Sequence, residues 1–426
     1  MARLYEKGFN MWPAAKDLPQ YGVLSGVKVV HATMAQAAPF GVSFLADYGA
    51  DVIWVENALM PDVRRFLSNR CVESDSRNQR NISLNIPSEE GRKIFFELLK
   101  DAEVFIECSK GGQYDRWGLS DEVLWEVNPR LVIVHESGFG QSGDPSYVTR
   151  PAFDSIAQAY SSYMDANRNP VTAPYPVGPF VGDFMTGVYI AMATLAALVK
   201  ARETGIGESV DIAQFECLAK AQQYQATWLT DHETRERAGD SSPMAGYGTF
   251  LCSDGEYAQL QLTSAKAVEK GCEVFGLEYG TDDIPKGVSI LYTGTPGGDL
   301  LRQAMTEFCA AHTADEAAQI LIDCGIPASK VNTMEDLEHD PHALARNLFD
   351  EWTAFNGDTI RSVRSVPVFK KNPNRVWRAA PWQGMDNEDI LGQLGYSEEQ
   401  VKDLYDQKII AKDAEGDLVY PWKNRK

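Results

Sequence analysis

Short apolar runs rich in β-branched residues alternate with helical patterns over the first half of the chain. The runs VKVVH, DVIWVE, EVFIE and LVIVH are typical of buried strands. Because such strands alternate with apolar residues at helical spacing, the pattern predicts an α/β fold with a parallel sheet covered on both faces. The predicted strands are residues 27–31, 51–56, 103–107, 131–135 and 208–212. The helices predicted between the first four of these strands are residues 39–48, 88–99 and 120–127.

Three longer helical patterns follow, over residues 154–164, 183–202 and 214–230. The second contains an uncharged run of sixteen residues, 184–199. A membrane-spanning helix needs roughly 20 apolar residues. We therefore expect a buried helix and no membrane partner.

The pattern changes after residue 230, where short strand-like segments around 249–252 and 257–262 alternate with turn residues. Capping boxes at 313–316 and 397–400 mark the starts of two further helices. We expect a large domain over residues 1–230, a small α+β domain over 231–344 and a C-terminal segment over 345–426.

The charge balance excludes some partners. The 426 residues include 60 acidic and 40 basic ones, a net charge of −20, which disfavours binding to nucleic acid or anionic lipid. Seven cysteines without a CxxC pair are typical of reduced thiols. The N-terminus lacks the apolar core of a signal peptide. These features favour a cytoplasmic protein.

Asp183 is the carboxylate of greatest interest. It follows Gly182 and precedes a long apolar helix, so the helix dipole favours its ionised form. A carboxylate placed there is either a nucleophile or a helix cap. Asp154 stands at the start of the preceding helix, where its position indicates another helix cap.

Common catalytic motifs are absent or incomplete. GFGQSG at residues 138–143 follows a strand but opens no helix, so it indicates a turn more than a dinucleotide site. No HExxH, GxSxG or GxxxxGK[ST] motif occurs, which argues against a metal site, a serine hydrolase and ATP use. Basic and hydrogen-bonding residues in 77–80, 109–116 and at Arg150 suit a polyanionic ligand.

Taken in order, these segments resemble the family III CoA-transferases over nearly the full chain. The matching stretches include LSGVKVV, RNQRNISLNI, DAEVFIECSKG, VNPRLVIVHESGFGQSG, GDFMTG, TGIGESVDIAQFE and GMDNEDILGQLGYSEEQV. Within the family, IWVEN and WRAAPWQGMD are similar to stretches of the carnitine and bile acid CoA-transferases. A substrate of either the bile-acid or the carnitine and betaine kind follows from this resemblance.

The resemblance implies an interlocked homodimer. In each subunit a large Rossmann-like domain is built from both chain ends, and residues 345–426 return to it. The motif Gly182-Asp183-Phe184-Met185-Thr186-Gly187 implies that Asp183 is the nucleophile, with Asp154 and Gln36 beside the reacting carbonyl. The residues expected to contact CoA are Ala37, Asn78, Arg80, Lys110 and Arg116.

The implied activity moves CoA from an acyl-CoA thioester to a free carboxylic acid, without ATP and without a permanently bound cofactor. Asp183 would form a mixed anhydride and then an aspartyl-CoA thioester. Backbone N–H groups at the helix start and the Gln36 amide would stabilise the oxyanions. Two alternatives stay open: an α-methylacyl-CoA racemase, although Phe153 stands where those enzymes have a histidine, and a CoA-binding protein without catalysis.

Overall fold

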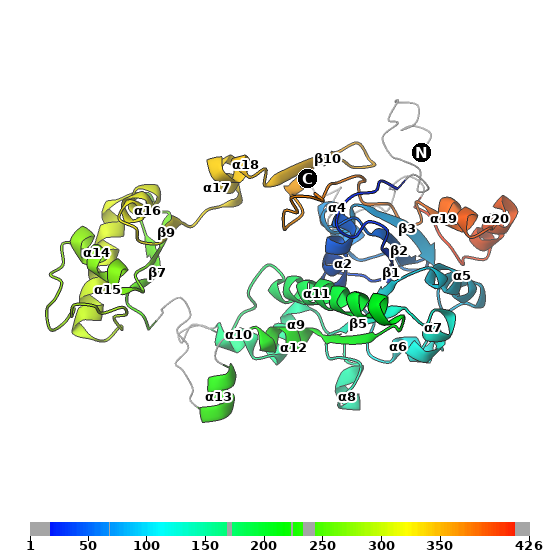
Figure 1. Ribbon diagram of the computed structural model, residues 1–426, viewed down its shortest axis with the longest axis horizontal. Coiled ribbons are helices and arrows are strands. Elements are labelled where there is room, and N and C mark those ends of the chain that lie inside the picture. The colour runs from blue at the N-terminus through cyan, green and yellow to red at the C-terminus, as the bar shows by residue number, and fades with distance from the viewer. Residues whose placement is uncertain (1–17, 68, 168–172, 223–224, 233–242, 414–426) are drawn as a thin grey trace. The chain divides into compact units, whose positions relative to one another are not determined.

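Six strands form one parallel sheet in the computed structural model of the chain, with strand order β3-β2-β1-β4-β5-β6 (Figure 1). Val29 of β1 pairs with Val52 of β2 on one side and Val104 of β4 on the other. The strands are β1 Lys28–Ala32, β2 Asp51–Asn57, β3 Gln79–Leu84, β4 Val104–Glu107, β5 Val132–Ser137 and β6 Ser209–Ala213. The structure describes residues 18–67, 69–167, 173–222, 225–232 and 243–413.

Alternate side chains of the sheet enter two separate cores. Val29, Val104 and Ile106 pack with helices α2 and α11 on one face, whereas Val30 and Phe105 pack with α5, α7, α19 and α20 on the other. Helices therefore cover both faces, as the sequence pattern predicts. The helices are α2 Ala37–Asp47, α5 Glu89–Lys100, α7 Asp121–Val127, α11 Val181–Thr204, α19 Asn387–Gln393 and α20 Glu398–Asp406.

The strand order reverses between β1 and β4, since β1 lies between β2 and β4. In sheets of this kind, ligands bind outside the carboxyl ends of the strands at such a reversal. Short helices occupy the connections at and around this edge. They are α3 Arg64–Leu67, α4 Asn69–Ser76, α6 Gln113–Arg116, α8 Pro145–Val148, α9 Asp154–Tyr160 and α12 Gln214–Lys220. A further short helix, α10 Tyr163–Ala166, follows α9 along the chain.

The C-terminal segment covers the edge strand β3. The backbone N–H groups of Asn81 and Ser83 donate to the side chains of Asp386 and Asn387 at 2.8 and 2.9 Å. These bonds take the place of a further strand, so the edge is closed. The same segment contains the antiparallel pair β10 Phe349–Thr353 and β11 Thr359–Val363.

The chain divides into two compact units. The larger comprises residues 1–163, 176–226 and 347–426, and the smaller comprises 164–175 and 227–346. The smaller unit packs a three-stranded antiparallel sheet against helices around its own core. Its elements beyond residue 226 are β7 Tyr247–Leu251, β8 Tyr257–Gln261, β9 Ala328–Lys330, α14 Ala265–Phe275, α15 Pro296–Ala311, α16 Ala314–Asp323, α17 Met334–His339 and α18 Pro341–Ala345.

Two of the predicted long helices are broken. The pattern over 154–164 forms α9 and α10, because Ser162 between them has a positive φ of 63°. The pattern over 214–230 forms α12 and α13 Gln225–Asp231. The predicted capping boxes at Thr313 and Ser397 are both present. After β5 the GFGQSG segment turns at Gly140 and Gly143, which have positive φ, and only the four-residue α8 follows.

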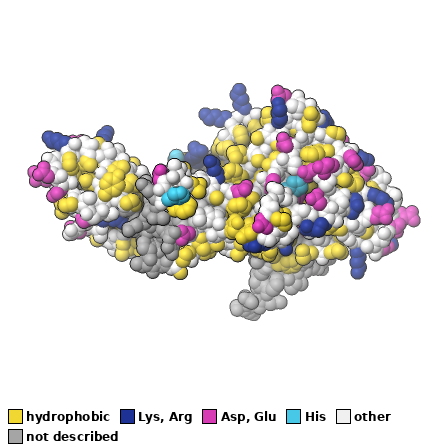
Figure 2. Space-filling view, turned by 90° about the horizontal axis from the view of Figure 1, so that it is seen from below, with side chains coloured by type: hydrophobic (Ala, Val, Ile, Leu, Met, Phe, Trp, Pro, Cys, Tyr) yellow, Lys and Arg dark blue, Asp and Glu magenta, His cyan; other side chains and the backbone are white. Residues whose placement is uncertain are grey.

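Helix α11 is the one helix among the described residues that is long and apolar enough to cross a membrane by length and composition alone. Core helices pass the same test. Ile190, Ala197 and Leu198 of α11 are buried against the sheet with α2. The expected burial holds for this face only, because Val188, Met192 and Val199 on another face are exposed. Figure 2 shows hydrophobic side chains in patches among charged ones on the molecular surface.

Candidate active site

Asp183 is the third residue of α11, and its partly buried carboxylate lies at the amino end of the helix. Its Oδ1 accepts a hydrogen bond of 2.6 Å from Nε2 of Gln214. Gln214 directly follows β6 and is the first residue of α12. The end of the edge strand β6 and the start of the core helix α11 thus bring these two side chains together.

Asp154 caps α11 rather than its own helix. Its Oδ1 accepts hydrogen bonds from the backbone N–H groups of Gly182 at 2.7 Å and Asp183 at 3.2 Å. Its Oδ2 accepts one of 2.8 Å from Gln158. Glycine is needed at 182, because a Cβ there would lie 2.8 Å from Oδ1 of Asp154. The structure therefore places Asp154 beside Asp183.

Phenylalanine rings fix the start of α11 against α2. The ring of Phe184 lies edge-on to that of Phe40, with 4.7 Å between centroids. Since Phe184 follows Asp183 directly, this contact limits the rotation of the helix about its axis. The packing of the two helices thus sets the direction of the Asp183 side chain.

The surroundings of Asp183 disfavour negative charge. Burial raises the pKa of Asp183 to about 6; the hydrogen bond from Gln214 lowers it and the nearby charge of Asp154 raises it. Burial also raises the pKa of Glu136, near the end of β5, to about 8, with further contributions from Asp183 and Glu107. Asp183 therefore loses its proton at a lower pH than Glu136 does.

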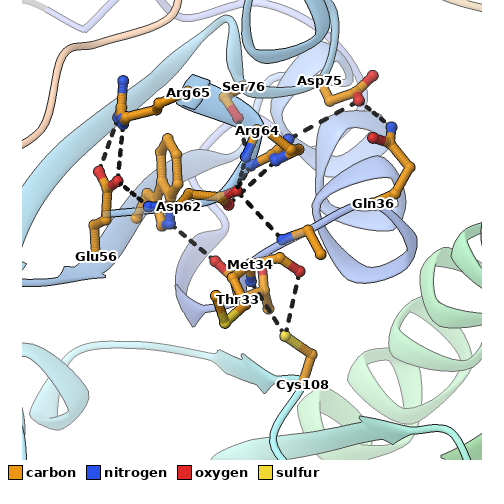
Figure 3. Close-up of polar contacts among 12 residues, drawn as sticks. Thr33, Met34, Gln36, Glu56, Asp62, Arg64, Arg65, Asp75, Ser76 and Cys108 are labelled. Atoms are coloured by element: carbon orange, nitrogen blue, oxygen red, sulfur yellow. Dashed lines mark hydrogen bonds and ion pairs between the residues drawn. The ribbon is translucent and has the colours of Figure 1, made fainter. Parts of the chain in front are cut away.

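Gln36 and Ala37 lie at the start of α2. The side-chain amide of Gln36 donates to Asp75 of α4, as Figure 3 shows, and does not cap the helix. Ala37 is the buried first residue of α2. Figure 3 also shows the buried ion pair of Arg64 with Asp62 beside this turn. The Gln36 amide is therefore part of a polar network at the ends of β1 and β2.

Arg80 and Asn78 are buried, and both side chains form hydrogen bonds with other residues of the chain. The Arg80 guanidinium donates to both carboxylate oxygens of Asp51 at 2.7 and 2.8 Å. Asn78 donates to Asp47 at 2.8 Å and to the backbone of Arg375 at 2.9 Å. A ligand contact by either side chain would require it to leave these partners.

Lys110 and Arg116 are exposed on the segment that follows β4. A cavity of about 120 Å³ opens beside this segment at the carboxyl ends of β1 and β2. Its wall includes Thr33, Met60, Ile86, Ser109 and Trp117. The cavity lies at the reversal of strand order, where the fold predicts a ligand.

Arg150 lies close to the same segment. A Cβ on Gly111 would lie 2.3 Å from the Val148 side chain, so residues 109–112 and the turn around 148–152 are in close contact. The exposed Arg150 guanidinium stacks on the Tyr147 ring at 3.5 Å from its centroid. Three exposed basic residues thus lie on neighbouring loops after β4 and β5, in a chain of net charge −20.

The sequence of residues 24–387 matches the family described as CoA-transferase family III. The chain belongs to this family. The similarity extends to curated relatives in two Proteus strains. An L-carnitine CoA-transferase of Proteus mirabilis (strain HI4320) is 38% identical over 398 residues, which cover 92% of this chain and 97% of that protein. Another L-carnitine CoA-transferase, from Proteus sp. (strain LE138), is 37% identical with the same coverage.

Solved structures of similar proteins support the fold. A CAIB/BAIF family protein from Brucella suis has a TM-score of 0.75 and 27% identity, covering 88% of this chain and all of its own. A protein of Mycobacterium tuberculosis at 22% identity has a TM-score of 0.74 and covers 87% of this chain. The resemblance drawn from the sequence motifs is therefore confirmed, and the chain is a CoA-transferase with a mixed α/β fold.

The histidines of the larger unit have other partners. His31 bonds to Thr33 and Gln79, and His135 lies between Glu107 and Asp121. Within the described residues, no hydrogen bond joins a histidine to Asp154 or Asp183. His31 and His135, the two histidines of the larger unit, are thus held by residues other than this pair.

Sequence reasoning missed Gln214, Glu136 and Asp75. Gln214 and Glu136 lie at or directly after predicted strands, at the sheet edge where ligands bind. Their position after a strand was the sequence feature that could have identified them as site residues. Which of the polar residues at such an edge face Asp183 depends on the packing of α11, and the sequence pattern does not reveal it.

Proposed function

We propose that the protein transfers CoA from an acyl-CoA to a free carboxylic acid through covalent intermediates on Asp183. The proposal rests on the burial, ionisation and hydrogen bonding of this carboxylate. It is partly buried and ionised near neutral pH, and Oδ1 is held by Gln214. No hydrogen bond to Oδ2 occurs in the described part of the chain, so this oxygen is free to attack a carbonyl.

The exchange conserves the free energy of the thioester. Asp183 Oδ2 attacks the acyl carbon, the carbon–sulfur bond breaks, and CoA thiolate leaves a mixed anhydride. The thiolate then attacks Cγ of Asp183 and expels the donor acid, which leaves an aspartyl-CoA thioester. An acceptor carboxylate reverses both steps. No ATP is needed, because each intermediate is an activated acyl group.

CoA carries phosphates, which charge-assisted hydrogen bonds recognise. We propose that Lys110, Arg116 and Arg150 contact these phosphates and that the cavity at the end of β1 and β2 receives the adenine end. The N–H of Ala37 at the start of α2 is a further donor. Arg80 and Asn78 hold Asp51 and Asp47 and, in this proposal, shape the site without touching CoA.

We propose that the acceptor is a carboxylic acid of the carnitine or betaine kind. The support is the name of the two Proteus relatives, which are L-carnitine CoA-transferases. Bile-acid-like acceptors are the other class that the sequence stretches suggest. Purified enzyme offered one labelled acyl-CoA and either carnitine, γ-butyrobetaine or cholate would reveal the preferred acceptor by the labelled product.

The test of the covalent step uses hydroxylamine, which captures an activated carboxyl as a hydroxamate. Wild-type protein incubated with acyl-CoA and hydroxylamine should carry the hydroxamate on the peptide that contains Asp183. Asp183→Ala should bind CoA without transfer, whereas Glu89→Ala, which removes an exposed carboxylate from α5, should keep full transfer. Turnover by Asp183→Ala, or CoA binding without exchange in the wild type, would reject this function.

We also propose a cytoplasmic homodimer. All seven cysteines are free thiols, which suits a reducing compartment. The exposed apolar residues of α11, Met192 at 56% and Val199 at 70%, suit burial by a second subunit. The division into a large domain over residues 1–230, a small domain over 231–344 and a segment over 345–426 that returns to the large domain belongs to the same proposal. Light scattering of the wild type and Val199→Asp would test the dimer.

A further inference from the structure

Most of the donors that the sequence suggests for the oxyanions are already engaged. At the start of α11, the N–H groups of Gly182 and Asp183 donate to Asp154, and that of Phe184 donates to the carbonyl of Phe180 at 3.1 Å. The Gln36 amide donates to Asp75. An oxyanion that forms on Asp183 itself therefore needs another donor.

Gln214 is placed to be that donor. Its side chain is only 3% exposed, and its Nε2 is 2.6 Å from Oδ1 of Asp183. One turn later, Leu218 of the same helix packs against α11, since a Cβ on Gly182 would lie 3.0 Å from Leu218 Cδ1. The amide is thus fixed against Asp183 before any substrate binds.

No cation shares this task. In the described part of the chain, no lysine or arginine forms an ion pair with Asp183. The neighbouring ionisable groups Asp154 and Glu136 are carboxyls, and the side chain of Glu136, a residue only 8% exposed, forms no hydrogen bond with a described residue. In such surroundings a negative oxygen depends on neutral dipoles aimed at it.

We propose that the side-chain amide of Gln214 is the oxyanion donor for every attack on the carbonyl carbon of Asp183. This role rests on the proposed covalent function. When CoA thiolate attacks Cγ of the anhydride, a sulfur–carbon bond forms and the carbonyl electron pair moves to Oδ1. The pair returns as the bond from Cγ to Oδ2 breaks, and the donor acid leaves with Oδ2. The amide faces Oδ1 throughout and strengthens its bond as the charge develops.

The same role recurs in the second half of the cycle. An acceptor carboxylate attacks Cγ of the aspartyl-CoA thioester, and the charge again develops on Oδ1. By contrast, the two attacks on substrate carbonyl carbons place the charge on a substrate oxygen. Loss of the Gln214 amide should therefore slow the steps at Cγ most.

The test compares Gln214→Met with the wild type in a rapid-quench experiment with acyl-CoA alone. Methionine keeps the length of the side chain and removes the donor. Removal of one such donor typically lowers a rate about 10²- to 10³-fold. We expect formation of the aspartyl-CoA thioester, measured by mass on the Asp183 peptide, to slow about 100-fold while the acyl anhydride accumulates.

Gln222→Met is the matched control. Gln222 lies two residues beyond α12 and donates to Ser161 and Ser162, not to Asp183. Its replacement loses comparable hydrogen bonds and should leave both rates unchanged. Equal thioester formation in the wild type and Gln214→Met would overturn the role of Gln214. Absence of both adducts in the wild type would instead reject the covalent function itself.

Gln214→Glu provides a second readout that a purely structural role would not move. A glutamate donates to Oδ1 only when it is protonated. Transfer by this variant should therefore fall as the pH rises from about 6 to 9, where the wild type keeps its rate, since an ordinary carboxyl loses its proton near pH 4 and burial beside Asp183 raises that value. A parallel pH profile in both proteins would contradict the proposal.

Discussion

Gly41 of α2 and Gly187 of α11 lie backbone to backbone. A Cβ on Gly187 would lie 3.0 Å from the amide nitrogen of Gly41, and a Cβ on Gly41 would lie 2.8 Å from the carbonyl oxygen of Gly187. The last glycine of the GDFMTG motif thus allows the backbones of two helices to lie close together. This approach sets the position of Asp183, one turn earlier.

Gly187→Ala should therefore destabilise the protein and misplace the nucleophile. Overpacking a tight contact costs about 1 to 3 kcal/mol, and transfer should fall with it. Gly392→Ala in α19 is the control, because nothing lies within 4 Å of its added Cβ, and alanine is a better helix former by about 1 kcal/mol. Urea unfolding of both variants measures the difference. Equal stability of the two would show that the helices tolerate a wider spacing.

Asp183→Asn should be more stable than the wild type at pH 8. The pKa of Asp183 is raised from 3.8 to about 6 in the folded state, so its ionisation opposes folding. The folded protein holds its proton between these values, and the cost is fully present above pH 6 and absent below pH 4. Asparagine keeps the acceptor for Gln214. Thermal unfolding at both pH values should show a gain of about 3 kcal/mol only at the higher pH, because one pKa unit corresponds to about 1.4 kcal/mol. A gain at pH 4 would contradict this prediction.

The rate of transfer should rise with pH through about 6, because the nucleophile is the ionised Asp183. Asp154→Asn should move this limb to lower pH, since the Asp154 charge raises the pKa of Asp183. The asparagine oxygen still accepts the N–H bonds at the start of α11. Single-turnover rates across pH 4 to 9 would measure the rising part of the pH profile in the wild type and in Asp154→Asn. This range covers the pH at which carboxyls at perturbed sites titrate. A limb unmoved by Asp154→Asn would exclude this coupling.

Lys110→Ala and Arg116→Ala should each weaken CoA binding about 10-fold, which corresponds to one charge-assisted hydrogen bond. Lys93→Ala, which removes an equally exposed lysine from α5, should leave the affinity unchanged. Calorimetric titration with CoA at two salt concentrations measures these affinities. If both variants bind CoA with wild-type affinity, the CoA phosphates do not bind at Lys110 and Arg116.

Arg80→Ala should act on stability instead. Loss of hydrogen bonds to a charged group costs about 1.5 to 3 kcal/mol, and the buried guanidinium of Arg80 donates two such bonds to Asp51, whose side chain is 22% exposed. Urea unfolding should show this loss, whereas CoA affinity at low temperature should stay near the wild-type value. A stable variant that no longer binds CoA would instead support the direct contact that the family resemblance implies.

The sequence predicted the parallel sheet well because most of its strands are apolar. It missed β3, whose sequence QRNISL reads as a loop although all six residues are buried. Gln79 bonds to His31, Arg80 to Asp51 and Asn81 to Glu56. Each of these partners is distant in sequence, so no local pattern could reveal that the polar side chains would be satisfied inside the fold.

The same reason limits prediction of the site. The glycines and the apolar helix singled out Asp183 from the sequence. Its cap, Asp154, lies 28 residues away from Gly182, and its hydrogen-bond partner Gln214 lies 31 residues away from Asp183. These relationships arise only when α9, α11 and α12 pack together, and they decide which groups are left to stabilise an oxyanion.

The central claim is that Asp183 takes part in bond making. A carboxylic acid labelled with the heavy isotope of oxygen in both carboxylate positions tests it most directly. In the proposed cycle the acceptor attacks Cγ through one oxygen, and that oxygen stays on Asp183 when the thiolate leaves with the acceptor acyl group. After turnover with an acyl-CoA, mass spectrometry should find the heavy isotope in the peptide that contains Asp183. Turnover that leaves this peptide unlabelled would contradict the account.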